Sequence, residues 1–309
     1  MNTKTIKTII IALLFAANLF FMLSIFSLGR DASTIPRNMA EDAATILESR
    51  GIRAETNKIP LVKPWELIYE GVYPGGELYQ KIIAAFYPES TGEESQSGYI
   101  MPNGGLSMTA GKFKFLFGTD GDLAVSVIRE GEHELVAAEI YEKIEEVKKI
   151  GTVGVRDSEV NLAASVFGDF LTALGGGSKN VSFDVIGFNR RGDTEIEAVV
   201  RQNIDKIALG ENCLYIRVTD GQITYLAGKW YFGELLASFT MPLLDSVNIL
   251  FKCADKDFTP GGSEDTLSAM SHEYAVMRQN AERFYLIPSW RIEFESGSSY
   301  LYNMVTGAR

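Results

Sequence analysis

The sequence is poor in the residues that bind soft metals and that cross-link small domains. It has two cysteines, Cys213 and Cys253, and two histidines, His133 and His272, among 309 residues. These are too few for a structural zinc site or a disulfide framework, so a bound metal would need oxygen ligands. The apolar surroundings of both cysteines favour buried thiols, and a disulfide between them stays open at this point.

Basic residues are also scarce relative to acidic ones. Forty Asp and Glu against 29 Lys and Arg give a formal net charge of −11. A chain of this sign repels phosphate backbones, which argues against nucleic-acid binding. In contrast, 46% of the residues are hydrophobic. We therefore expect an ordered core and not a disordered chain.

Ionisable side chains are missing altogether from the run 8–29. Its length matches the ~20 residues that cross a bilayer, so the sequence predicts a single transmembrane helix there. Lys4 and Lys7 precede the run, which places residues 1–7 in the cytoplasm and the bulk of the protein outside, as a single-pass protein of the cell membrane. The alternative is a cleaved signal peptide, but the run is longer than a typical signal-peptide core.

Three residues of this run are candidate contacts with partner helices in the membrane. Asn18 lies near the predicted midplane, where its amide would gain from a hydrogen bond with another helix. Ala12 and Ala16 form a pair of small residues on roughly the opposite face, which allows close backbone approach. The alternative for Asn18 is a tolerated polar residue that bonds to its own backbone.

The remainder reads as an α+β protein with largely antiparallel sheets. Apolar residues recur at helical spacing in five segments, at about 36–50, 77–87, 134–149, 157–174 and 266–282. Alternating apolar residues or turn dipeptides indicate strands, at about 65–72, 123–128, 181–185, 195–201, 214–218, from 223 onward, and in a hairpin over 290–305.

An internal similarity indicates a duplicated unit. Residues 104–115 align without a gap on residues 221–232, with five identical positions and three conservative ones. We therefore expect two related extracytoplasmic α+β subdomains, 30–152 and 153–309, each with helices on one face of its sheet. The alternative is chance similarity between two glycine-rich turns.

The local signatures of catalysis are missing from the sequence. It has no nucleophile elbow, no H-E-x-x-H helix and no phosphate-binding glycine loop. Asp120 and Asp122 lie in a glycine-rich turn but fall short of the six to eight oxygens that calcium needs. The triplet 191–193 spells Arg-Gly-Asp, which turn preferences alone also produce. We expect no enzymatic activity, no cofactor and no metal site.

Two stretches resemble a known family. TIKTIII at 5–11 with the later Asn18, and IPSWRI at 287–292 followed by YLYN at 300–303, are similar to YycI-type proteins of the YycH/YycI family. The resemblance implies a non-enzymatic, membrane-anchored accessory regulator of a sensor histidine kinase that controls cell-wall metabolism in Gram-positive bacteria. It also implies contacts with the kinase and with a YycH-like sister protein through membrane helices.

The leading hypothesis is thus an accessory regulator that acts through its membrane helix and its outer body. An alternative is a ligand-binding or cell-wall-associated module that the helix merely tethers. A third hypothesis, a wall-modifying hydrolase, requires a cleft with converging carboxylates.

Overall fold

The fold contains two compact units, each assembled from separate stretches of the chain. The computed structural model describes residues 34–72, 76–86, 96–100, 105–111, 113–118, 124–129, 137–152, 157–174, 180–192, 194–230, 234–256, 265–280 and 283–309. The first unit holds the described residues of Met1–Glu66, Met241–Ser271 and Ser289–Arg309, and the second holds those of Leu67–Thr240 and His272–Pro288. The predicted boundary at 152/153 lies inside the second unit.

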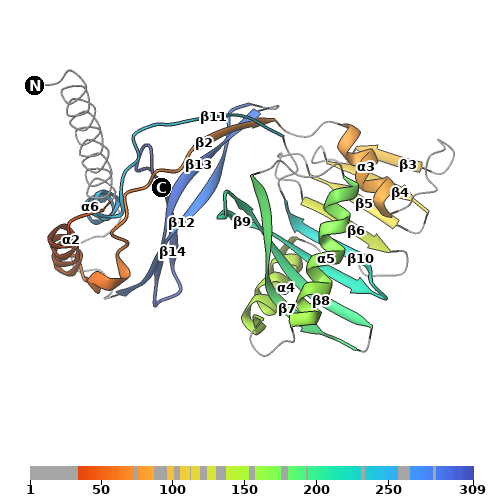
Figure 1. The fold of residues 1–309 in the computed structure, drawn as a ribbon, viewed down its shortest axis with the longest axis horizontal. Helices are drawn as coiled ribbons and strands as arrows, with labels where there is room; N and C mark the ends of the chain where they lie inside the picture. The colour runs from red at the N-terminus through yellow and green to blue at the C-terminus, as the bar shows by residue number, and fades with distance from the viewer. Residues whose placement is uncertain are drawn as a thin grey trace, which may run out of the picture. The chain divides into compact units, whose positions relative to one another are not determined.

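One sheet of fourteen described strands contributes to both units (Figure 1). Its main path runs β11-β2-β13-β12-β9-β10-β6-β5-β4-β3, with β1, β7, β8 and β14 paired off this path. The strands are β1 (Ile52–Arg53), β2 (Ile68–Val72), β3 (Gln96–Ile100), β4 (Leu106–Ala110), β5 (Phe113–Phe117), β6 (Ala124–Arg129), β7 (Val181–Arg190), β8 (Glu195–Ile204), β9 (Ile207–Thr219), β10 (Gln222–Lys229), β11 (Glu234–Phe239), β12 (Asp265–Arg278), β13 (Arg283–Phe294) and β14 (Ser299–Asn303).

Helices cover both faces of the sheet in the second unit. Alternate residues of β8 belong to different cores: Ala198 and Val200 pack with α3 (Gly76–Phe86) and α5 (Asp157–Ala173), whereas Val199 packs with α4 (Ala137–Ile150). Because successive side chains of a strand point to opposite faces, α4 lies on the face away from α3 and α5. Both faces of β8 are therefore covered, and its residues from Ile196 to Val200 are all buried.

The first unit has a core of its own, built on two helices. These are α2 (Arg37–Ser49) and α6 (Ser246–Lys256), whose apolar faces pack with the ends of β12 and β13 and with β14. Asp245 caps α6 by accepting a hydrogen bond from the Asn248 backbone amide at 2.9 Å. Trp290 is fully buried in this core, and its indole N–H donates to the Leu244 carbonyl at 3.1 Å.

The predicted fold of two related subdomains is wrong, because the similar segments fold differently. Residues 104–115 span the β4–β5 hairpin, which turns at Gly111, whereas residues 221–232 include the single strand β10. A Cβ on Gly228, the counterpart of Gly111, would lie 2.3 Å from the Cys213 carbonyl oxygen of β9. The shared glycine thus permits a turn in one segment and close strand approach in the other.

The helix predicted over 266–282 is also wrong, since this segment forms most of β12. Leu267 and Met270 are buried in the core of the first unit, and Tyr274 is buried in that of the second. A strand that supplies two separate cores shows apolar residues three and four apart, which imitates helical spacing. Helix α6, which the sequence analysis missed, has a regular apolar face of Val247, Leu250 and Cys253.

The part of the chain that the structure describes contains no helix with the length and apolar character needed to cross a bilayer. The run 8–29, where we predicted such a helix, lies outside the described residues. On this finding we withdraw the prediction of a single-pass protein of the cell membrane, together with the extracytoplasmic placement that followed from it.

Candidate functional site

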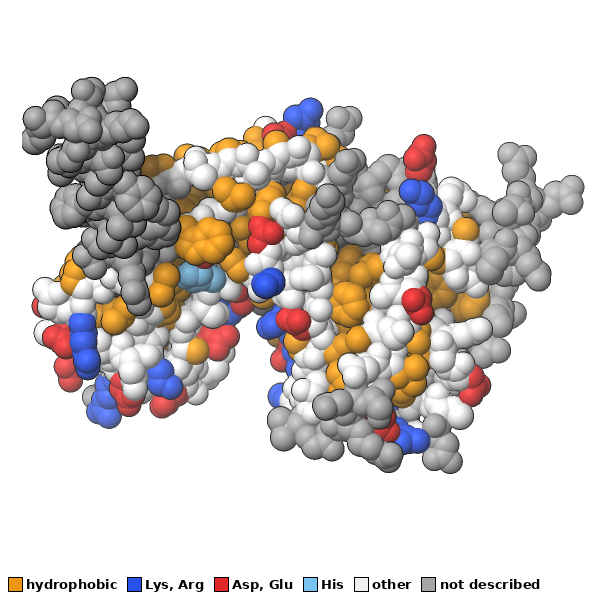
Figure 2. Space-filling view, viewed as in Figure 1, with side chains coloured by type: hydrophobic (Ala, Val, Ile, Leu, Met, Phe, Trp, Pro, Cys, Tyr) orange, Lys and Arg blue, Asp and Glu red, His pale blue; other side chains and the backbone are white. Residues whose placement is uncertain are grey.

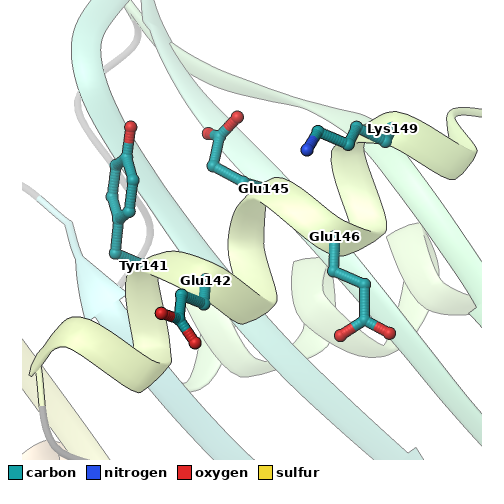
Figure 3. A pocket seen from close by; sticks show the side chains of 5 residues that line it. All are labelled: Tyr141, Glu142, Glu145, Glu146 and Lys149. Atoms are coloured by element: carbon teal, nitrogen blue, oxygen red, sulfur yellow. The ribbon is translucent and has the colours of Figure 1, made fainter.

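The outer face of α4 carries a shallow depression lined by one helix. Its lining side chains are Tyr141, Glu142, Glu145, Glu146 and Lys149. Figure 3 shows Tyr141, Glu145 and Lys149 on one side of the helix and Glu142 and Glu146 on the other. These groups do not converge on a shared point, so the depression lacks the arrangement that a small-molecule site requires.

The charges on α4 pair with neighbours along the helix. Lys143 lies 2.6 Å from Glu146 and Lys148 lies 2.9 Å from Glu145. The hydrogen bond and charge of Lys143 lower the pKa of the Glu146 carboxyl. Exposed pairs of this kind stabilise a helix by a few tenths of a kcal/mol and have no catalytic geometry.

A buried carboxylate lies on the sheet face that α4 covers. Glu197 of β8 is 1% exposed. It accepts hydrogen bonds from two side chains of neighbouring strands and forms an ion pair with Arg191, the residue after β7. The Tyr215 hydroxyl donates to it, the Asn189 amide donates at 3.1 Å and the Arg191 guanidinium lies at 2.9 Å. Burial, followed by this bond to Glu197, raises the pKa of the Tyr215 hydroxyl. A buried charge that is paired and bonded in this way holds the strands in register.

A second tyrosine network closes the β8–β9 hairpin. Asp205 and Lys206 adopt the left-handed backbone of a two-residue turn, with φ of 48° and 70°. Tyr69 of β2 donates to Asp205 and accepts a hydrogen bond from the Asn180 amide at 3.1 Å. Burial, with the bond to Asp205 next in size, raises the pKa of the Tyr69 hydroxyl to about 12.

Both networks are occupied in holding strands together. In each, the tyrosine hydroxyl donates a hydrogen bond to a carboxylate and its pKa is raised, so neither tyrosine is activated as a nucleophile. Among the described residues, no group of three or more His, Cys, Asp or Glu side chains is arranged to hold a metal ion. Cys213 in β9 and Cys253 in α6 are both buried and are not joined in a disulfide, the alternative that the sequence left open.

The edge strand β11 of the second unit exposes two large apolar side chains. It lies at the end of the strand path and pairs with β2, and no other described strand pairs with it. A bulge between Leu235 and Ala237 leaves Leu236 without a partner on β2. Leu236 is 49% exposed and Phe239 39% exposed. Figure 2 shows hydrophobic side chains gathered on the surface where β11, β2 and β13 lie.

After Glu234, the rest of β11 and the segment that follows it carry no charge. The sequence 235–244 contains no Asp, Glu, Lys or Arg. Behind it, Glu70 of β2 and Arg283 of β13 form an ion pair at 2.6 Å, and the ring of Phe239 meets that of Tyr285 edge-to-face at 6.0 Å. Natural proteins usually protect edge strands with charges or proline. β11 has a single charge, Glu234 at its first residue, and no proline, and among the described strands only β2 pairs with it.

The site residues predicted from the sequence lie outside the described residues. These are Ala12, Ala16 and Asn18 of the predicted membrane contact. Asp120, Asp122, His133 and Asp193, to which the sequence analysis assigned no site, also lie outside them. His272 is described and lies in β12, not in a helix. The sequence analysis missed β11, although the uncharged run 235–244 was a visible signal for it.

Comparisons with known proteins do not assign this chain to a family. No family model and no curated protein matches the sequence. Among solved structures, the chain is similar to an uncharacterized protein from Eubacterium rectale ATCC 33656, with 14% identity and a TM-score of 0.42. The match covers 86% of this chain and 97% of that one. A likeness at this level carries no argument about function, and the resemblance to YycI-type proteins stays a prediction.

Proposed function

We propose that the protein is a non-catalytic binding protein, which regulates a partner protein by pairing the edge of β11 with an extended segment of that partner. The observation that carries this proposal is the edge of β11, which no other described strand pairs with and on which Leu236 and Phe239 are exposed. An added strand gains main-chain hydrogen bonds along such an edge, and pockets for its alternate side chains provide selectivity.

The rigidity of the second unit supports this role. The hydrogen bond between Tyr215 and Glu197 joins β9 to β8, and the bond between Tyr69 and Asp205 joins β2 to the β8–β9 turn. β2 is the strand with which β11 pairs. A fixed edge binds without the cost of ordering itself first. The resemblance to YycI-type proteins names a sensor histidine kinase as the partner to test.

A pull-down with the tagged full chain tests the proposal. Crosslinked cells should yield a histidine kinase with the unaltered protein and much less with Leu236→Lys, because a lysine on the edge opposes strand addition. The matched control is Ile100→Lys, which puts a lysine at another exposed apolar position, in the edge strand β3. Equal recovery of the kinase with both variants, or no kinase at all, would contradict the proposal.

A further inference from the structure

We infer that the second unit contains a joint, at which one group of strands opens as a single body from the rest of that unit. The group, called here the ribbon, consists of β2, β11 and the parts of β12 and β13 that belong to the second unit. The hydrogen bond from the Tyr69 hydroxyl to Asp205 is the latch that keeps the joint closed. The inference goes beyond the proposed function, because it concerns how the unit opens and not what β11 binds.

The backbone connection between the ribbon and the rest of the sheet is short. β9 pairs with β8 along one edge and, over residues 214–219, with β10 along the other edge. Only the beginning of that second edge remains for β12. Within the described strands, β12 and β9 pair at Glu273↔Ala208 alone. The main chain therefore holds the β8–β9 hairpin together along its length but holds the ribbon to it at one point.

The joint has a small apolar core of its own. Ribbon side chains pack there with side chains of the β8–β9 hairpin, and all are at most 3% exposed: Tyr69, Tyr274, Phe284 and Leu286 from the ribbon, and Ile204 and Leu209 from the hairpin. This core is separate from the one under α3 and α5 and from the one under α4. Leu235 of β11 also packs against it, so the strand with the exposed edge takes part in the joint.

The ribbon is held together more firmly than it is held to the hairpin. Within it, β2 pairs with β11 on one side and with β13 on the other. Glu70 of β2 and Arg283 of β13 form an ion pair at 2.6 Å, and the ring of Phe284 fills the space that a side chain at Gly71 would need. Structures open first where few bonds and little buried surface join two well-bonded parts. That place in the second unit is the joint.

Tyr69 forms two side-chain hydrogen bonds across the joint. Its hydroxyl donates to Asp205 in the turn of the β8–β9 hairpin and accepts a bond from the Asn180 amide at 3.1 Å. The Asp205 backbone amide donates to the Asn180 carbonyl at 2.8 Å, which fixes both partners of Tyr69 on the hairpin side. Hydrogen bonds to a carboxylate are stronger than those between neutral groups, so loss of this bond favours opening.

Thiol labelling of the purified full chain tests the inference. Ile204→Cys puts a thiol in the core of the joint, and Val200→Cys puts one in the core under α5, at sites of β8 that are 1% and 0% exposed. Peptide mass spectrometry reads each thiol separately from the buried Cys213 and Cys253. With iodoacetamide, the thiol at position 204 should react roughly tenfold faster or more, because it needs only the joint to open.

Removal of the latch should act on one of these thiols only. Tyr69→Phe should speed the reaction at position 204 by about 10- to 100-fold and leave that at position 200 unchanged. The matched control is Tyr285→Phe, on β13 but outside the core of the joint, which should change neither rate. Equal rates at positions 204 and 200 overturn the inference. So does a rate at position 204 that Tyr69→Phe leaves unchanged, or an equal acceleration of both.

Hydrogen exchange gives a second test without a new cysteine. Tyr69→Phe should speed the exchange of amides 207–209 and 272–274, which lie at the joint, and should leave amides 214–218 of β9 as they are. Unchanged exchange at the joint overturns the inference. Neither measurement involves a partner, so failure of the joint does not affect the proposed function, and loss of the kinase from the pull-down does not affect the joint.

Discussion

Glycine 187 should be intolerant of a single added methyl group, because α4 lies directly against it. A Cβ at this position would lie 2.6 Å from the Val147 carbonyl oxygen and 2.8 Å from the Val147 carbonyl carbon. These are backbone atoms of the helix and cannot rotate away. In addition, the Phe188 amide donates to the Gly151 carbonyl at 3.1 Å, which fixes the end of α4 to the bulge of β7.

Gly187→Ala must therefore push α4 away from the sheet. Ile144 and Val147, which α4 buries against Val199 and Tyr215, would lose part of that packing. Forcing one methyl group into a packed contact of this kind costs about 1–3 kcal/mol. Hydrogen exchange measured by mass spectrometry should show α4 amides exchanging about 5- to 150-fold faster, since each 1.4 kcal/mol is a factor of ten.

The matched control is Gly192→Ala. No atom lies within 4 Å of a Cβ at Gly192, so this change should stay within about 0.5 kcal/mol of the unaltered protein. Equal exchange rates in α4 for both variants would refute the reasoning. Equal rates would mean that α4 does not pack directly against Gly187 of β7.

Three further changes probe the polar groups of the two units. Tyr215→Phe should lower the free energy of unfolding by about 1–3 kcal/mol, because Glu197 loses a buried donor; in a double-mutant cycle with Glu197→Gln, the losses should fail to add. Tyr69→Phe should remove one phenol that ionises with a pKa of about 12, read from ultraviolet absorbance. Because this folded-state pKa is raised, the stability that Tyr69 contributes is complete below pH 10 and is lost as the pH rises through about 12. Asp245→Ala should cost about 1 kcal/mol by removing the cap of α6, measured by urea unfolding, and Asp245→Asn should retain most of it.

Local patterns in the sequence were sufficient to predict most helices. Helices α2, α3, α4 and α5 lie close to the predicted segments because each buries one continuous apolar face against a single core. The dipeptide Asp220–Gly221 is a strong tight-turn signal in the sequence, and it forms the turn between β9 and β10, where both residues have positive φ. In these places the local preference and the tertiary environment agree.

The prediction failed where one segment serves more than one part of the fold. β12 carries residues of two cores, and β13 likewise passes from the second unit to the first. Units assembled from separate stretches of chain have no boundary that a composition shift reveals. The Glu197 network was equally inaccessible, because it joins side chains of β7, β8 and β9 through a register known only from the fold.

The β11 edge lies between these two cases. Its uncharged run is plain in the sequence, but its exposure follows from its place at the end of the strand path. A largely apolar strand in the middle of a sheet is ordinary, whereas the same strand at an edge can pair with another strand. The position of β11 in the sheet, which the sequence does not show, is therefore what makes this segment a candidate binding site.

Photo-crosslinking from single positions tests most directly that β11 is a binding edge. A photoreactive amino acid at Leu236 should give a covalent adduct in living cells, and the mass of the adduct will separate a second copy from a different protein. The same group at Ile100 of β3 should give none. Adducts at Ile100 with none at Leu236 would contradict the account.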